Sequence, residues 1–524
     1  MTALGDLRMG ARFLWQVPSF LRHPLTIEEA RATLRRRLEH READFLALAK
    51  HAIYEYPPSP YRALLRLAGC EYGDLALLVR RDGVEDALGA LLRQGVYLTV
   101  DEFKGRRPLS RGGVTVEVTR LGLGNPMSRA LVAGQTSGSR GTPAPVPMGL
   151  DFIRDLAVNE CLNVAAREGL GWVPARWSVP TVPFTLVSAA SGMPPVRSFS
   201  PIDPASVDRR HGWSMRLLGW AGRLAGVRIA APEHAPPDDP SLILAWLRQV
   251  RRSGSAAYLT AYTSSAVRLC QAAIDAGIDV TGTQLLAVGE SLTAARLAVM
   301  RSAGVGVIAN YTSMDAGIIG NGCRSPLAPD EVHLFHDFLA VIQPSRSSDA
   351  PTLPSDALFV SSLRATAPLM LLNVCLGDRA VMVVRRCDCS LERLGWMTHL
   401  HTVRSFEKLT AAGMTFLDTD VIRILEHVLP ARFGGSPTDY QLVEEEGDDG
   451  RPILRLLVHP NVGPVDGEVV AETFLAAAGD GSSTAKIMGS VWRDARLLRV
   501  ERRPPLGTAS GKILHVHAQR RPAT

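Results

Sequence analysis

One segment combines hydroxyl groups, glycine and an arginine in a way that suits a phosphate chain. It runs Gln135-Thr136-Ser137-Gly138-Ser139-Arg140-Gly141-Thr142-Pro143. This composition predicts a loop with exposed backbone N–H groups and hydroxyls, which proteins use to wrap phosphate. The segment lacks the spacing of a Walker loop, and a Gly/Ser-rich run taken alone is more often a linker. Its meaning therefore depends on the residues that follow it.

Four later motifs add an aromatic ring, carboxylates and a lysine. Tyr311-Thr312-Ser313-Met314-Asp315 follows a predicted strand, and Gly377-Asp378 closes an apolar run. Arg404-Ser405-Phe406-Glu407-Lys408 stands where the character of the chain changes, and Thr508-Ala509-Ser510-Gly511-Lys512-Ile513 comes much later. Each has a plainer interpretation: a core tyrosine at a strand end, an aspartate that caps a turn, or a solvated lysine. Their joint order gives them weight.

The elements that must position these motifs alternate between strands and helices. After a mostly helical region, 27–110, we expect strands at 256–259, 284–288 and 305–310, and helices at 151–167, 204–224, 239–252, 266–276 and 293–302. This alternation predicts a mostly parallel sheet with helices on both faces. In such sheets ligands bind beyond the carboxyl ends of the strands. Gly289-Glu290 and Tyr311 lie at such ends.

Past about residue 403 the pattern changes. Strands are expected at 440–445, 453–459 and 496–500, with a helix at 467–477. A chain of 524 residues is too long for one ordinary core. We therefore predict an α/β fold: a large N-terminal domain of layered sheets and helices, residues 1–403, and a small C-terminal α+β domain, residues 404–524.

Composition limits the partners and the compartment. The formal charge is +6, but the arginines are spread along the chain among acidic residues, so we expect no nucleic-acid partner. No run approaches the roughly 20 apolar residues of a spanning helix, and residues 1–10 do not resemble a signal peptide, so we expect no membrane insertion. Seven cysteines, an odd number, favour a reducing, cytoplasmic location.

Cys387-Asp388-Cys389 is the one close pair of cysteines in the sequence. A zinc site would need two further ligands, for which Cys375 and His399 are candidates. Two cysteines in an ordinary turn are the alternative, and the sequence leaves this choice open.

The order of the motifs resembles that of the adenylate-forming superfamily, which includes acyl-CoA ligases, adenylation domains of peptide synthetases and luciferases. Thr136 to Pro143 resembles its phosphate loop, S-S-G-T-T-G-x-P, and Tyr311 to Asp315 resembles its Y-G-x-T-E motif. Gly289-Glu290 resembles the segment that lines the adenine pocket, and Gly377-Asp378 the ribose-binding pair. Arg404 to Lys408 resembles the hinge, and Thr508 to Lys512 the loop with the catalytic lysine. The resemblance covers most of the chain.

This resemblance implies ATP and Mg²⁺ as cofactors and assigns roles to residues. Lys512 and Asp315 would be catalytic, with Asp315 holding Mg²⁺ and Lys512 bridging charge between carboxylate and phosphate. The small domain would be mobile about a hinge at Phe406. The implied nucleotide-binding residues are Thr136, Ser137, Gly138, Ser139, Arg140, Gly141, Thr142, Gly289, Glu290, Tyr311, Thr312, Asp378 and Arg404.

A narrower resemblance is to phenylacetate–CoA ligases and acyl-protein synthetases. It rests on Ala49–Gly69, Gly289–Asn321 and Val332–Asp337, and on the Cys387–Cys389 pair, which is similar to their C-x-C-G segment. The chain departs from the superfamily pattern where Ala144 replaces a common lysine and Phe406 replaces the hinge aspartate or lysine. These departures indicate a divergent member, and Phe406 weakens the case for a large domain rotation.

The expected activity is that of an ATP-dependent, AMP-forming ligase. It would adenylate a small carboxylic acid, with aromatic acids the first candidates, and pass the acyl group to a thiol such as CoA or a carrier protein. One alternative keeps the chemistry but uses a nitrogen acceptor, as an amide synthetase does, or a non-carboxylate oxyanion such as nitrite, as a diazotase does. Another is a non-catalytic nucleotide-binding protein, against which Asp378 and Lys512 argue.

Overall fold

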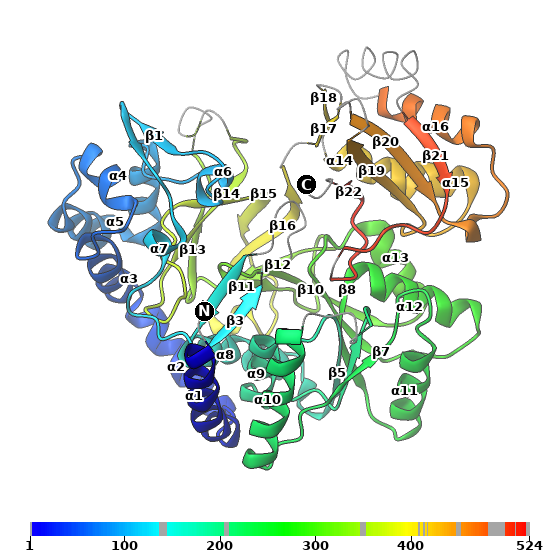
Figure 1. The fold of residues 1–524 in the computed structure, drawn as a ribbon, viewed down its shortest axis with the longest axis horizontal. Coiled ribbons are helices and arrows are strands. Elements are labelled where there is room, and N and C mark those ends of the chain that lie inside the picture. Colours follow the sequence, from blue (N-terminus) through cyan, green and yellow to red (C-terminus); the bar gives the residue numbers. More distant parts are fainter. Residues whose placement is uncertain are drawn as a thin grey trace.

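The structure is a computed structural model that describes residues 3–135, 144–203, 209–345, 350, 353–406, 409–411, 414–416, 418–446, 452–479, 498–508 and 510–519. Two large hydrophobic cores and one small buried cluster lie within these residues. One core runs from Phe13 to Leu400 in sequence, and the other from Val421 to Val516. The elements that carry the second core form a smaller part of the molecule, mostly orange to red in Figure 1, beside the green helices of the larger part. The predicted boundary at 403/404 stays a prediction.

A sheet of twelve described strands forms the centre of the larger part. Six of these strands lie in the order β10-β9-β8-β5-β6-β7 and are parallel to their neighbours. They are β5 (Val173–Trp177), β6 (Arg197–Ser200), β7 (Pro232–His234), β8 (Ala257–Tyr262), β9 (Gln284–Val288) and β10 (Gly306–Ser313). The predicted strands 256–259, 284–288 and 305–310 are therefore confirmed as β8, β9 and β10.

The other half of the sheet is antiparallel, so the prediction of a mostly parallel sheet is wrong there. It continues from β10 in the order β11-β12-β16-β15-β14-β13. After β10 the chain turns back directly into β11, whereas a parallel connection needs a crossover of a dozen or more residues. These strands are β11 (Gly317–Asn321), β12 (Val332–Leu334), β13 (Leu339–Ile342), β14 (Ala357–Ser362), β15 (Val374–Val384) and β16 (Thr398–Ser405).

Helices cover both faces of the parallel half, as predicted. Val164 of α8 (Leu150–Ala166) packs with Tyr258, Leu286 and Ile308. The next residues along these strands, such as Leu259, point to the opposite face because side chains alternate along a strand. They belong to the main core together with α12 (Thr263–Asp275) and α13 (Ala294–Ser302). All six residues of β8 are buried, which fits a strand covered on both faces.

Local signals explain where several helices begin. The hydroxyl of Thr293 accepts a hydrogen bond from the backbone N–H of Arg296 and caps α13. Thr26 and Glu29 form a capping box at the start of α2. The remaining large-domain helices that bear on the prediction are α1 (Ala3–Arg22), α2 (Ile27–Glu39), α3 (Arg41–Ala49), α4 (Tyr61–Leu67), α5 (Tyr72–Arg93), α10 (Arg209–Ala225) and α11 (Ser241–Arg252).

The smaller part is a four-stranded sheet with helices packed on it. Its strand order is β21-β20-β19-β22. The expected strands 440–445 and 453–459 are observed as β19 (Tyr440–Glu446) and β20 (Pro452–Val458), beside β21 (Leu498–Arg502) and β22 (Val516–Gln519). The helices are α14 (Asp418–Arg423), η5 (Ile424–Val428), α15 (Leu429–Phe433) and α16 (Gly467–Gly479). None of the helices in the described part of the chain has the length and apolar character needed to cross a bilayer.

Candidate active site

The candidate site lies at the carboxyl ends of three neighbouring parallel strands. β8 ends at Tyr262, β9 at Val288 and β10 at Ser313, and these strands pair in the order β8-β9-β10. Because the strands are parallel, their ends meet at one edge of the sheet. Gly289-Glu290 therefore lies beside the end of β10, which carries Tyr311, as the sequence predicted.

Lys512 reaches this edge from the smaller part of the molecule. Its Nζ lies 5.2 Å from the centre of the Tyr262 ring. It also lies against the backbone of Gly289, where an added Cβ would come within 2.9 Å of Lys512 Nζ. Gly289 has a φ of 75°, which a residue with a side chain rarely adopts. The approach of the ammonium group and the backbone conformation both explain why this position is glycine.

The loop around Lys512 is a closed turn that docks on the large domain. Gly511 N–H donates to the carbonyl of Thr508 at 2.7 Å, and Thr508 N–H donates to the carbonyl of Lys512 at 2.8 Å. The next residue, Ile513, donates its N–H to the hydroxyl of Ser264 on α12 at 3.1 Å. The turn is therefore held in shape by its own backbone and in place by α12.

Glu290 belongs to a charged network that crosses between the two parts. Its carboxylate accepts hydrogen bonds from the backbone N–H and the hydroxyl of Ser264, at 2.6 and 2.9 Å, and lies 3.5 Å from Arg296. Arg296 Nε donates to Glu426 of η5 at 2.8 Å, and both residues are buried. His515, which follows the Lys512 loop, contacts the same Glu426 oxygen at 2.6 Å.

The network sets the ionisation of its members. Burial alone would raise the pKa of Glu426, but the hydrogen bond from His515 and the charge of Arg296 outweigh it and lower that pKa to about 2. Burial lowers the pKa of Lys512 below its usual value, and the negative Glu290 opposes this effect. The side chain of Lys512 thus rests in a desolvated place where an incoming anion would be favourable.

Tyr311 and Asp378 lie in direct contact. The Tyr311 hydroxyl donates to Asp378 Oδ2 at 2.9 Å. Burial and the negative Asp378 raise the pKa of Tyr311 well above its usual value, so the phenol keeps its proton. In the order of the sheet, three strands separate β10 from β15. Neighbouring strands are about 4.8 Å apart, so this contact requires the sheet to curl.

Asp315 is buried and pairs with an arginine that the sequence did not suggest. Arg120 Nη1 lies 3.0 Å from Asp315 Oδ1. The neighbouring Met314 packs against Gly134 of β3 (Val132–Gln135), where a Cβ would lie 2.7 Å from the Met314 sulfur. β3 pairs with β4 (Pro145–Met148) in a hairpin. Asp315 is therefore adjacent to the hairpin whose strands flank the predicted phosphate loop.

The predicted phosphate loop itself lies outside the described residues. This applies to Thr136, Ser137, Gly138, Ser139, Arg140, Gly141 and Thr142. The register of the hairpin pairs Gln135 with Pro145. The described chain thus brings the two ends of the segment together beside Met314 and Asp315.

The other predicted residues are engaged with the large sheet. The Thr312 hydroxyl bonds to the side chain of Asn310 on its own strand. Arg404 Nη1 pairs with Asp330 at 2.6 Å. Phe406 donates its N–H to the carbonyl of Gly377 at 3.0 Å and packs against the large core. Glu407 and Lys408, which complete the predicted hinge motif, lie outside the described residues.

The structure thus forms two groups from the predicted residues. Lys512 meets Gly289 and Glu290, and Tyr311 meets Asp378 with Phe406 beside Gly377. Sequence reasoning missed the residues that contact or support the predicted ones, because these residues belong to no motif and their contacts join separate segments of the fold. They are Arg120, Tyr262, Ser264, Arg296, Glu426 and His515.

No protein-family model matches the chain, and no curated protein matches its sequence. Solved structures do match. One is 2-hydroxyisobutyryl-CoA ligase in the postadenylation state with 2-HIB-AMP, at a TM-score of 0.52 and 13% identity, over 95% of this chain and 91% of that chain. The same ligase with 2-HIB-AMP and CoA in the thioesterification state has a TM-score of 0.46 and 14% identity, over 95% and 91%. ATP-bound MatB from Rhodopseudomonas palustris has a TM-score of 0.42 and 11% identity, over 78% of this chain and 68% of that chain. The likeness to the first of these structures, with a TM-score above 0.5 at 13% identity, shows a shared fold.

Proposed function

We propose that this chain, which has the two-domain fold of the adenylate-forming ligases, is an ATP-dependent, AMP-forming ligase. It adenylates a small carboxylic acid, with aromatic acids the first candidates, and passes the acyl group to a thiol such as CoA or a carrier protein. The observation that carries this proposal is the position of Lys512. A lysine of the smaller part lies at the carboxyl ends of β8 and β9, against Tyr262 and Gly289.

The chemistry needs a cation at this place. A carboxylate is a poor electrophile, so one of its oxygens first attacks the α-phosphorus of ATP, and the bond to pyrophosphate breaks. Negative charge then lies on both the entering carboxylate and the phosphate oxygens, and a positioned ammonium group stabilises it. Among the described residues, Lys512 Nζ lies over the aromatic ring of Tyr262, and the charge of Glu290 acts on it. A carboxylate and a phosphate that bind at these strand ends would meet the ammonium group of Lys512.

The predicted nucleotide residues fit this scheme. The Tyr311–Asp378 pair offers an aromatic face next to a carboxylate that would accept the ribose hydroxyls. Asp315 offers hard oxygen ligands for Mg²⁺, which proteins bind through one or two carboxylates together with substrate phosphates. Its position beside the β3–β4 hairpin favours that role, and Arg120 would share the carboxylate. When bound, Mg²⁺ supplies positive charge to the phosphates.

The second half-reaction is attack of a thiolate on the acyl carbonyl, with AMP leaving. Lys512 is needed for the first half-reaction only, so the superfamily resemblance implies that the smaller part then moves. The contacts between Arg296 and Glu426, and between Ile513 and Ser264, are among those that such a movement would break.

One observation favours the alternative, in which the activated group goes to a nitrogen nucleophile or the activated oxyanion is nitrite. Phe406 at the predicted hinge is anchored to Gly377 and packs against the large core, unlike a solvated aspartate or lysine. A hinge that is bonded to the sheet in this way restricts rotation of the smaller part. A reaction without a thiol half-reaction does not need that rotation and would tolerate the restriction.

The test is pyrophosphate release from ATP and Mg²⁺ with a panel of carboxylic acids and nitrite, with and without CoA. We expect release with one acid class, and a CoA thioester when CoA is present. Acid-dependent release without a thioester would leave the alternative in place. ATP binding without turnover of any acid or nitrite would refute both enzymatic proposals. Lys512→Ala is the control for background ATP hydrolysis.

A further inference from the structure

A group of sulfur and nitrogen ligands lies away from the candidate active site. Cys323, His333, Cys387 and Cys389 each offer one ligand atom, and these atoms all lie within 4.8 Å of one another. Cys323 follows β11, His333 lies in β12, and the two other cysteines follow β15. Cys375 and His399, the further ligands suggested by the sequence, are not members of this group.

The distances fit a tetrahedral metal ion. His333 Nε2 lies 3.5 Å from Cys387 Sγ and 3.4 Å from Cys389 Sγ. Zinc binds thiolate at about 2.3 Å and imidazole at about 2.0 Å, so a tetrahedron has a sulfur-to-nitrogen edge of about 3.5 Å. The two separations match that edge.

The histidine is held in the tautomer that a metal requires. Its Nδ1 lies 2.6 Å from the backbone carbonyl of Trp396. A carbonyl can only accept, so Nδ1 carries the proton and the lone pair of Nε2 faces the sulfurs. A hydrogen bond from the second ring nitrogen to a carbonyl is the usual support of a metal-bound histidine.

The backbone around the two nearby cysteines is organised about the sulfur atoms. Asp388 has a φ of 55°, an uncommon conformation that persists where its surroundings impose it. The carboxylate of Glu392 accepts the N–H groups of Cys387 and Asp388 at 2.8 and 2.6 Å. The N–H of Glu392 in turn lies 3.5 Å from Cys389 Sγ, as a donor to a thiolate would.

We propose that Cys323, His333, Cys387 and Cys389 bind one zinc ion that fastens the β15–β16 connection to β12 and to the end of β11. Three thiolates and one imidazole form a soft, closed ligand set, which is typical of structural rather than catalytic zinc. A disulfide does not account for the group, since all seven cysteines are free. The binding of zinc displaces the thiol protons and involves no redox step.

The zinc site would affect the candidate active site through strand β15. Asp378 lies on this strand, and Cys387 follows its end at Val384. At about 3.3 Å per residue, roughly 20 Å of strand separates Asp378 from that end. The ion therefore holds the far end of the β15–β16 pair, whose near end carries Asp378 and Arg404.

The experiment measures metal content in the full-length protein, purified under reducing conditions. We expect one zinc per chain by mass spectrometry of the elements, released when the thiols are modified, and none in Cys389→Ser. Cys270→Ser is the matched control, because Cys270 is a buried cysteine of α12 outside the group, and it should keep its zinc. Should Cys389→Ser not fold, cobalt exchanged into the wild type must give the visible absorption of tetrahedral cobalt–thiolate.

The proposal predicts in addition that a strong zinc chelator lowers the midpoint of thermal unfolding of the wild type and of Cys270→Ser alike. Wild-type protein without zinc above background, and without the cobalt–thiolate bands after reconstitution, would overturn the proposal. A Cys387–Cys389 disulfide in freshly purified protein would also overturn it. None of these readouts depends on the ligase activity, so the two proposals fail separately.

Discussion

Glu426→Gln tests whether the buried pair between Glu426 and Arg296 holds Lys512 at the carboxyl ends of β8 and β9. The substitution keeps the volume and one acceptor oxygen but removes the charge. The pKa of Glu426 is lowered from 4.5 to about 2, and about 1.4 kcal/mol per pKa unit gives about 3 kcal/mol. His515 belongs to the smaller part itself, whereas Arg296 and Thr293 belong to the large one. We assign roughly half of this free energy, about 1.5 kcal/mol, to the contacts that hold the smaller part on the large one. Loss of this amount would shift the equilibrium toward the undocked state by roughly tenfold.

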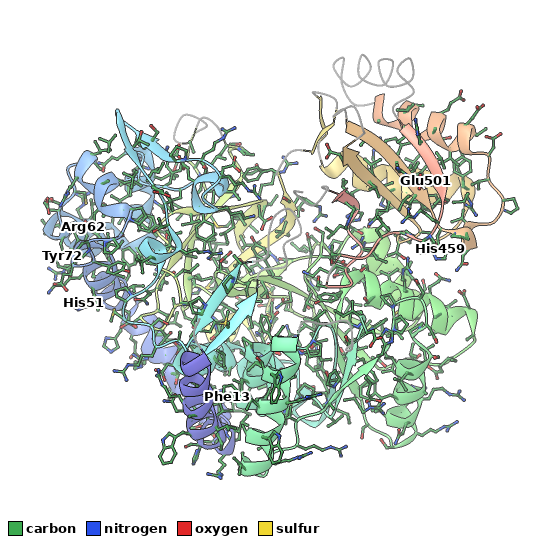
Figure 2. All side chains as sticks on the ribbon, viewed as in Figure 1. Phe13, His51, Arg62, Tyr72, His459 and Glu501 are labelled. Carbon is green, nitrogen blue, oxygen red and sulfur yellow. The ribbon has the colours of Figure 1, made fainter. Side chains whose placement is uncertain are left out.

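The assay is acylation of the Lys512 amine by an excess of reagent, followed by peptide mass spectrometry. When docking is fast, the rate is proportional to the undocked fraction, so Glu426→Gln should be acylated roughly tenfold faster than the wild type. Glu501→Gln is the matched control. Glu501 of β21 lies in the smaller part (Figure 2) and pairs there with Arg455 of β20, so the rate should not change.

Two results would refute this reasoning. If Lys512 is acylated at the same rate in Glu426→Gln and the wild type, the pair does not hold the two parts together. If Glu501→Gln accelerates acylation equally, the cause is a general loosening of the smaller part. Acid should imitate the substitution. Because the pKa of Glu426 is lowered, its contribution is complete above about pH 4.5 and is lost as the pH falls toward 2. Fluorescence energy transfer between the two parts should therefore report undocking in that range.

Three further substitutions test the site. Lys512→Ala should slow acid-dependent ATP–pyrophosphate exchange by about 100-fold or more with unchanged ATP affinity, because it removes a charge used in the transition state; undiminished exchange would contradict the role of Lys512. Gly289→Ala should slow the exchange by roughly tenfold, because its Cβ would meet Lys512 at 2.9 Å. Gly282→Ala is the control, with a similar φ of 85° and no atom within 4 Å, and an equal loss there would assign the effect to backbone strain. Tyr311→Phe removes a hydrogen bond to Asp378 worth about 1.5 to 3 kcal/mol, and calorimetry should show ATP affinity reduced by roughly tenfold; unchanged affinity with lower thermal stability would make the pair structural.

The local elements could be predicted from the sequence. β9 has the predicted bounds, and α11, α13, β10 and β19 begin or end within a few residues of them. The reason is that a strand or helix is encoded by the spacing of its own apolar residues, which is a property of one short window. The alternation of elements also predicted that Gly289-Glu290 and Tyr311 would lie at one edge of a sheet.

The partners of these elements could not be predicted in the same way. Nothing near Tyr311 indicates that its hydroxyl meets Asp378, 67 residues away, since that contact depends on the curl of an antiparallel half that the sequence did not reveal. Glu426 and Thr293 are 133 residues apart and carry no motif. Cys387 and Cys389 were visible as a pair, but Cys323 and His333 join them through the packing of β11, β12 and β15.

The sequence by itself determined which chemical groups occur and in which order, and this order of hydroxyls, carboxylates and a lysine led to the prediction of a site for ATP and a carboxylate. The tertiary structure decided which of them meet. Lys512 lies against Gly289 and Tyr262 because Ile513 and Glu426 bind the large domain at Ser264 and Arg296. Such contacts depend on long-range packing of buried charge and apolar surface, which no local pattern records.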